Sequence, residues 1–321
     1  MVDKILLTGG SGFLGSSLAR RLLKEGHSLV ILDDCSRGKL NRIEDILDRV
    51  VFIEGDIRHE QTVIEAARGC NAIFHLAFVN GTRFFYEKPE LVLDVGVKGA
   101  LNTIRASIEN NVETYVLASS SEVYHQPVQI PTPETERLLI PDVLNPRFSY
   151  SGGKLISELL TINMMRKLPI RDMIFRPHNV FGPDMGFEHV IPEIMEKLKI
   201  ATLGWDKKDV KISIQGGGLE TRAFCFVEDA VDQIMTIYRK GKKGNIYHVG
   251  FDEEITIKKL IDYIAQILDL NVIVKPSELK SGSTTRRSPD ISKIQKIGYS
   301  KMNNFYKGLK EAVFWYKRTS I

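Results

Sequence analysis

Residues 5–15 read Ile5-Leu6-Leu7-Thr8-Gly9-Gly10-Ser11-Gly12-Phe13-Leu14-Gly15, and this stretch decides the fold. Its apolar start predicts a buried strand, and a turn dense in glycine follows. Residues 16–26 then have the spacing of an amphipathic helix that ends at a glycine. Strand, glycine turn and helix together predict the first unit of a dinucleotide-binding domain.

Three glycines give this turn a chemical use. Gly9 allows a tight turn, because glycine tolerates positive φ. Gly12 has no side chain that would keep a pyrophosphate away from the helix N-terminus, whose N–H groups favour anions. Gly15 lets the helix lie close to the strand. The spacing is G-x-x-G-x-x-G rather than G-x-G-x-x-G, so an ordinary tight turn is the alternative interpretation.

The next apolar stretch, residues 28–32, ends at Asp33-Asp34. An acidic residue about 20 positions after the glycines would accept hydrogen bonds from the adenosine ribose hydroxyls. It would also repel a 2′-phosphate, so the sequence favours NAD over NADP. Arg37 is the one neighbour that could accommodate such a phosphate.

The first half of the chain alternates between short apolar runs and helical patterns. Further strands are expected at 50–57, 72–77, 114–119 and 171–176, and helices at 40–48, 61–68, 91–110 and 150–167. This alternation predicts an α/β fold with a doubly wound parallel sheet. We expect an NAD-binding domain at 1–177 and a smaller, mixed α/β substrate lobe at 178–321, with segments that can interleave.

Polar residues gather where the expected strands end, which is where such sheets bind ligands. Asp56 could accept a hydrogen bond from the adenine amino group while Ile57 packs beside the ring, although a helix N-cap is the alternative. His75 lies within an apolar strand and is better explained as a hydrogen-bonded core histidine than as a catalytic one.

Tyr150 and Lys154 are four residues apart and therefore share one helix face. A tyrosine hydroxyl ionises near pH ~10, and a neighbouring ammonium together with the positive nicotinamide would favour the phenolate. Tyr150 could then remove the proton of a substrate hydroxyl, and Ser120 could hold that hydroxyl. An exposed helix pair without a function is the alternative.

The motifs occur in the order TGGSGFLG, LDD, GDI, HLA, SSSEVY, YSGGK and RPHNVFGP, and they resemble the NAD-dependent nucleotide-sugar epimerase/dehydratase family of extended short-chain dehydrogenase/reductases. The resemblance implies cofactor contacts from Gly9, Gly12, Phe13, Leu14, Gly15, Asp33, Asp34, Asp56, Ile57, Leu76, Ala77, Tyr150, Lys154 and Pro177. It implies catalysis by Tyr150, Lys154, Ser120 and Glu122. It implies nucleotide-sugar contacts from Ser121, Asn179, His189, Val190, Arg222, Arg287 and Asp290, and a diphosphate does require guanidinium groups.

Two positions depart from the usual pattern of the family, and a third distinguishes the reaction types within it. Phe78 replaces a usual alanine after HLA, and Gly96 replaces a usual asparagine. Glu122 is typical of the 4,6-dehydratases and decarboxylases, whereas plain 4-epimerases tend to have a small or hydroxyl residue there. A carboxylate at this position could remove the C5 proton of a 4-keto sugar, or it could be merely structural.

The resemblance implies transient oxidation at C4 of a nucleotide-diphosphate hexose, and we expect 4-epimerisation slightly ahead of other outcomes. The alternative is 4,6-dehydration, or decarboxylation or net oxidation, with Glu122 as the C5 base. A reductase of a non-nucleotide substrate is a remote third interpretation. By analogy, the helices at 91–110 and 150–167 would pair with their copies as a homodimer through a four-helix bundle.

Composition narrows the class of protein further. The 321 residues carry a net charge of +4 and contain only three cysteines, Cys35, Cys70 and Cys225. These numbers argue against a disulfide framework, a metal site and a nucleic-acid partner. The sequence has no apolar run of membrane-spanning length and no apparent signal segment, so we expect a cytoplasmic protein without a membrane partner.

Overall fold

The computed structural model describes residues 2–278, 286–300 and 304–319. Its largest element is a seven-stranded sheet, in the order β11-β6-β5-β4-β1-β2-β3, in which every pair of neighbours is parallel. The strands are β1 (Lys4–Thr8), β2 (Ser28–Asp33), β3 (Val50–Glu54), β4 (Ala72–His75), β5 (Thr114–Ala118), β6 (Arg171–Pro177) and β11 (Asn245–Val249). The predicted doubly wound α/β fold is confirmed.

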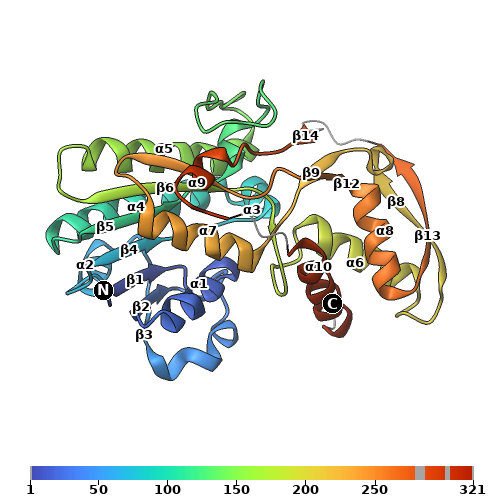
Figure 1. Ribbon diagram of the computed structural model, residues 1–321, viewed down its shortest axis with the longest axis horizontal. Coiled ribbons are helices and arrows are strands. Elements are labelled where there is room, and N and C mark those ends of the chain that lie inside the picture. The colour runs from blue at the N-terminus through green and yellow to red at the C-terminus, as the bar shows by residue number, and fades with distance from the viewer. Residues whose placement is uncertain (1, 279–285, 301–303, 320–321) are drawn as a thin grey trace.

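Helices cover both faces of this sheet (Figure 1). One face packs against α1 (Phe13–Lys24), α7 (Val227–Lys240) and α9 (Ser292–Lys296). The other packs against α2 (Glu60–Ala66), α3 (Thr82–Glu87), α4 (Pro89–Glu109) and α5 (Ser149–Met165). The central strands β1, β4 and β5 are mainly apolar, because both of their faces are buried.

The helix expected at 40–48 is instead two 3-10 helices, η1 (Leu40–Arg42) and η2 (Glu44–Arg49). Three further 3-10 turns are η3 (Ser121–Tyr124), η4 (Pro146–Phe148) and η5 (Gly216–Gly218).

A smaller lobe lies beside the sheet and has its own apolar core (Figure 1). Its helices are α6 (Val190–Ala201), α8 (Ile257–Leu268) and α10 (Phe305–Arg318). Its strands are β7 (Val180–Phe181), β8 (Asp209–Gln215), β9 (Thr221–Ala223), β10 (Cys225–Phe226), β12 (Glu254–Thr256), β13 (Asn271–Ser277) and β14 (Arg286–Arg287).

The chain crosses between these two parts more than once. After leaving the sheet at β6, it returns with α7 and β11, and β11 pairs with β6 at the sheet edge. Residues beyond 178 therefore build part of the large sheet as well as the lobe. Among the described residues, no helix is long and apolar enough to cross a membrane.

Candidate active site

Two glycines at the turn between β1 and α1, Gly9 and Gly15, have no room for a side chain. Gly9 has a φ of +75°, and a Cβ there would lie 2.7 Å from the backbone nitrogen of Ala77. A Cβ on Gly15 would lie 2.0 Å from the Gly9 carbonyl oxygen. Gly12 precedes α1 without a side-chain cap, and the first turn contains no acidic residue. This N-terminus therefore favours an anion.

A cleft adjoins this turn and contains five of the predicted cofactor residues beyond the glycines: Asp33, Asp34, Ile57, Leu76 and Ala77. Asp33 is nearly buried, and its carboxylate accepts hydrogen bonds from the backbone N–H groups of Ser11, at 3.0 Å, and Cys35, at 2.9 Å. The glycine cradle and the acidic residue at the end of β2 fit a dinucleotide whose ribose hydroxyls approach Asp33.

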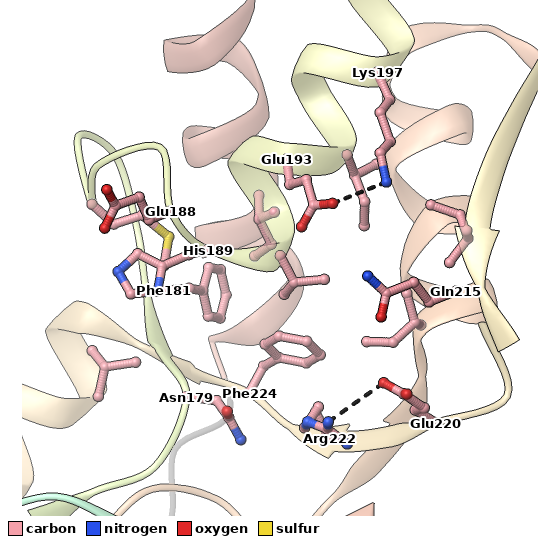
Figure 2. A pocket seen from close by; sticks show the side chains of 17 residues that line it. Asn179, Phe181, Glu188, His189, Glu193, Lys197, Gln215, Glu220, Arg222 and Phe224 are labelled. Carbon is pink, nitrogen blue, oxygen red and sulfur yellow. Dashed lines mark hydrogen bonds and ion pairs between the residues drawn. The ribbon is translucent and has the colours of Figure 1, made fainter. Parts of the chain in front are cut away.

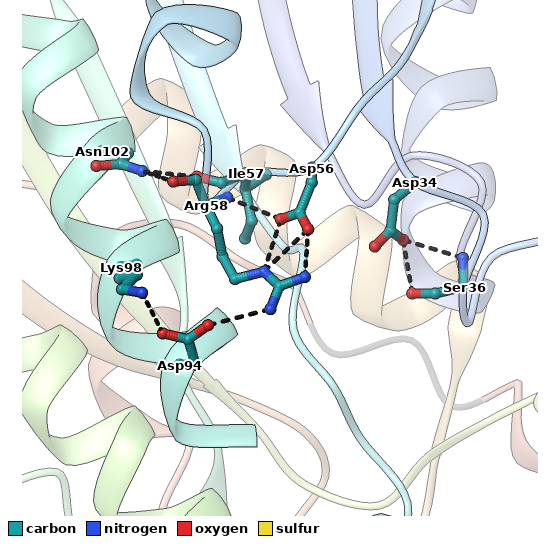
Figure 3. A network of polar contacts seen from close by, with 8 residues as sticks. All are labelled: Asp34, Ser36, Asp56, Ile57, Arg58, Asp94, Lys98 and Asn102. Carbon is teal, nitrogen blue, oxygen red and sulfur yellow. Dashed lines mark hydrogen bonds and ion pairs between the residues drawn. The ribbon is translucent and has the colours of Figure 1, made fainter. Parts of the chain in front are cut away.

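Asp56 belongs to a charged network that Figure 3 shows. Arg58 pairs with Asp56 and also reaches Asp94, at 3.0 Å, which in turn pairs with Lys98. Although burial acts in the opposite direction, hydrogen bonds from Arg58 lower the pKa of Asp56 below its usual value. Arg58 was not predicted as the partner of Asp56. Contact between Asp56 and an adenine remains a prediction.

Two other predicted cofactor residues, Phe13 and Leu14, have their side chains in other packing, and a third, Pro177, lies at the end of a strand. Phe13 packs near Gly182, and Leu14 packs against the apolar cores of both the sheet and the lobe. Pro177 ends β6, where it is paired with Val249. Any contact of Phe13 or Leu14 with a cofactor would therefore come from their backbone.

The predicted Ser-Tyr-Lys group comes together at the end of β5. Tyr150 and Lys154 lie on the first turns of α5, and both are buried. Burial raises the pKa of Tyr150 to about 12, against a hydrogen bond with Ser120 that lowers it. Burial also lowers the pKa of Lys154 to about 7, while its Nζ donates to the Ala118 carbonyl at 2.6 Å.

Two aromatic rings surround Tyr150. Phe85 stacks on it with centroids 4.8 Å apart, and Phe78 meets it edge-on at 5.2 Å. Phe85 was not predicted, because it lies on α3, a short helix that the sequence pattern did not indicate. The rings of Phe78 and Phe85 keep water away from the side of Tyr150. The protonation state of its hydroxyl therefore depends on the few polar groups that reach it.

Glu122 and Arg287 form an ion pair near this group. The positive charge of Arg287 holds the pKa of Glu122 below its usual value, against the effect of burial. Arg287 reaches the carboxylate of Glu122, and contact of Arg287 and Asp290 with a nucleotide sugar remains a prediction. The Asp290 carboxylate accepts the N–H of Ser292 at 2.8 Å and so also has a local structural role.

Arg222 lies next to Arg287, because the two are register partners across strands β9 and β14. Arg222 is largely buried, and its pKa is lowered first by burial and then by the charge of Arg287. Two neighbouring guanidinium groups favour an anionic ligand between or beside them.

A pocket of the smaller lobe contains four of the residues predicted to contact a nucleotide sugar: Asn179, His189, Val190 and Arg222 (Figure 2). Asn179 has a φ of +41° and donates from its side chain to the Ala223 carbonyl. Phe224 and Gln215 also line the pocket. Neither was predicted, since single residues far apart in the sequence give no pattern. Ser121, which was also predicted to contact a nucleotide sugar, is buried at the start of η3.

Comparison with known proteins places this geometry in a family. The profile of the NAD dependent epimerase/dehydratase family matches residues 5–250. The chain belongs to this family. NAD is its cofactor, and similar solved structures of a Streptomyces venezuelae dTDP-glucose 4,6-dehydratase and a Thermus thermophilus UDP-glucose 4-epimerase contain NAD.

Curated relatives differ in the reaction that their names give. A UDP-N-acetyl-α-D-glucosaminuronate decarboxylase of Bacillus cytotoxicus is 28% identical, with 99% of this chain and 98% of the relative covered. A human dTDP-D-glucose 4,6-dehydratase is 25% identical, with 98% and 90% covered. The structure of a Methanobrevibacter ruminantium UDP-N-acetylglucosamine 4-epimerase has a TM-score of 0.87 at 22% identity, with 98% of each chain covered.

Proposed function

We propose that this family member oxidises C4 of a nucleotide-diphosphate hexuronate and thereby drives loss of the C6 carboxylate as CO₂. The observation that carries the proposal is the Glu122–Arg287 pair at the Tyr150 end of the site. A guanidinium is the group best suited to a carboxylate, and a charged pair beside the reacting tyrosine suits a substrate with a charge at C6.

The chain's own residues can start the reaction at C4. Ser120 would hold the C4 hydroxyl, and Tyr150, which hydrogen-bonds with Ser120, would remove its proton. Bound NAD supplies the hydride acceptor and later the hydride donor. Arg222, the register partner of Arg287, would hold the diphosphate, so the sugar would extend from Arg222 toward Tyr150.

Decarboxylation then follows from the position of the ketone. A carboxylate at C6 is β to a ketone at C4, so the C5–C6 bond can break while its electron pair moves into a C4–C5 enolate. CO₂ leaves, a proton is added at C5, and the sugar becomes a pentose. No base is required at C5, so this reaction does not depend on Glu122 removing a proton.

The same pair disfavours 4,6-dehydration. That reaction requires a base for the C5 proton, and Arg287 makes Glu122 a weaker base by lowering its pKa. The 4-epimerisation that the sequence slightly favours has no use for a charged pair near C6. Several curated relatives are named as decarboxylases, which also supports the proposal.

The test is to incubate the NAD-loaded enzyme in D₂O with UDP-glucuronate and UDP-N-acetylglucosaminuronate, each labelled with ¹³C at C6. We expect ¹³CO₂ and a UDP-pentose with deuterium at C5 by NMR. UDP-glucose, UDP-N-acetylglucosamine and dTDP-glucose serve as comparison substrates, because they have no carboxylate at C6. A 4-epimer or a new C6 methyl group from these, with no ¹³CO₂ from the uronates, would overturn the proposal in favour of epimerisation or dehydration.

Two neighbouring arginines give a matched pair of variants. Arg287→Gln removes the guanidinium at Glu122, whereas Arg286→Gln removes an exposed one that pairs with Glu254. We expect Arg287→Gln to lower kcat/KM for the uronate by about 10²–10³, as loss of a charged contact to a substrate carboxylate would. Arg286→Gln should stay within a factor of about 3. Equal effects would argue against a role for Arg287 in carboxylate recognition.

A further inference from the structure

Phe78 and Gly96 both depart from the family pattern, and the structure places them against each other. A Cβ on Gly96 would lie 2.4 Å from Cζ of Phe78, and a Cβ on Gly153 would lie 3.0 Å from the same atom. The ring of Phe78 therefore sits in a notch that exists because α4 and α5 each have a glycine at this point. Larger residues at either position would displace the ring.

The face of this ring meets the ammonium of Lys154. Lys154 Nζ lies 4.0 Å from the centroid of Phe78 and 5.9 Å from that of Tyr150. Such a distance gives a cation–π attraction, which is strongest for a desolvated cation. Lys154 is only 4% exposed, so this condition is met.

The other groups around Lys154 give its charge limited support. The Ala118 carbonyl accepts one N–H, and the Glu158 carboxylate on α5 favours the charged form. Nearby His75 on β4 is neutral at pH 7, because burial lowers its pKa to about 3. Burial is the largest effect, and it lowers the pKa of Lys154 to about 7.

We propose that Phe78 is a positioning residue: its ring face keeps the Lys154 ammonium charged and directed beside Tyr150, in the notch that Gly96 and Gly153 leave open. The role assigned to Tyr150 rests on the proposed function, but the effect on Lys154 does not. The aromatic ring of Phe78 thus provides the attraction to the Lys154 ammonium that a polar side chain would otherwise have to provide. The charge on Lys154 then remains available to stabilise a phenolate at Tyr150.

The test measures the pKa of Lys154 directly and needs no substrate. NAD-loaded enzyme with lysine labelled with ¹³C at Cε is titrated by NMR, and the Lys154 signal is assigned with Lys154→Arg. Phe78→Leu keeps an apolar side chain but removes the ring. We expect the pKa of Lys154 to fall by about 1 in this variant. An unchanged pKa in a folded, NAD-binding variant would overturn the proposal.

A second substitution keeps the proposal testable if Phe78→Leu does not fold. Incorporation of 3,5-difluorophenylalanine at position 78 preserves the shape of the ring and weakens the negative potential of its face. We expect a smaller fall in the pKa of Lys154 than in Phe78→Leu. No fall at all would mean that Phe78 only fills space.

Activity gives an independent readout that a purely structural role would not produce. The loss of kcat in Phe78→Leu should be largest near pH 7 and disappear toward pH 5, where Lys154 is charged in both proteins. A loss that is equal at all pH values would contradict the proposal. If no uronate is turned over by wild-type enzyme, the proposed function fails while the titration still decides the role of Phe78.

Discussion

At the residue scale, the hydroxyl of Tyr150 is the group on which the proposed chemistry depends. Tyr150→Phe keeps the ring between Phe78 and Phe85 but removes the proton acceptor. We expect kcat to fall by about 10²–10⁴, the usual contribution of a positioned acid or base, with little change in NAD binding. Tyr306→Phe, on the exposed side of α10, is the control. Turnover of Tyr150→Phe within a factor of about 3 of wild type would remove Tyr150 from the mechanism.

Gly96 gives a second prediction at this scale, on stability. Alanine normally stabilises a helix interior relative to glycine, by about 0.5–1 kcal/mol. At position 96 the new methyl group would overlap Phe78, so we expect Gly96→Ala to destabilise the protein by about 1–3 kcal/mol. Gly152→Ala on α5 is the matched control, because its Cβ would meet only Ile140 at 3.9 Å. Chemical denaturation of both variants checks the difference, and equal midpoints would contradict the overlap.

Single residues of the site were predictable where they belong to a local pattern. Tyr150 and Lys154 share a helix face, and the glycines of the first turn share a spacing, so both groups could be found from sequence. The partners of Glu122 and Gly96 could not, since Arg287 and Phe78 reach them through the folded chain. A contact between distant residues leaves no periodicity in the sequence, and only packing reveals it.

At the element scale, a buried ion pair joins α5 to the sheet. Glu158 on α5 and Arg176 on β6 are about 2–3% exposed, and the carboxylate accepts two hydrogen bonds from the guanidinium. Glu158→Gln would leave Arg176 charged and buried without its carboxylate partner, and the hydroxyl of Tyr124 and the carbonyl of Glu134 would remain to accept its hydrogen bonds. We expect a loss of about 3–5 kcal/mol in the free energy of unfolding.

The double variant Glu158→Gln/Arg176→Met tests this reasoning, because removing both charges should restore part of the stability. Glu87→Gln, which breaks an exposed pair with Arg83, should leave the denaturation midpoint unchanged. If Glu158→Gln were as stable as wild type, the pair would not hold α5 in place. Other contacts of α5 would then have to hold Lys154 and Tyr150 in position.

Elements were predictable in the first half of the chain and less so in the second. Long apolar runs bounded by glycine or acidic residues identified six strands of the sheet. The seventh, β11, contains Asn245 and His248 and follows a basic loop, so its sequence does not read as a buried strand. It joins the sheet because α7 leads the chain back to the edge of β6. Such a return depends on tertiary packing rather than on local propensity.

At the scale of the whole molecule, the site is assembled from both parts of the chain. The sheet and its helices provide Ser120, Tyr150 and Lys154, while β9 and β14 of the smaller lobe provide Arg222 and Arg287. Residues about 165 positions apart in the sequence, Glu122 and Arg287, meet only when the lobe packs against the sheet. Disturbing that packing should therefore weaken substrate binding before it weakens NAD binding, since the cofactor cleft is built mainly from the first half of the chain.

The last prediction concerns the oligomeric state, and it rests on the exposed faces of α4 and α5. Four large apolar side chains lie there in water: Leu93 at 37% exposure, Ile108 at 40%, Ile156 at 37% and Leu159 at 53%. Large apolar side chains exposed on the surface of packed helices can mark an interface. We predict a homodimer in which α4 and α5 pair with their copies, and sedimentation equilibrium at micromolar concentration should give twice the chain mass of 36.3 kDa.

Ile156→Lys/Leu159→Lys should produce monomers, because two new charges on α5 of each chain would have to be buried at the interface. Leu203→Lys, which changes a more exposed leucine outside α4 and α5, should leave the mass unchanged. A wild-type mass of one chain at tens of micromolar would exclude this dimer. Since α5 also carries Tyr150 and Lys154, dimerisation would restrain the helix that positions both side chains. The monomeric variant should therefore show a lower kcat as well as a lower mass.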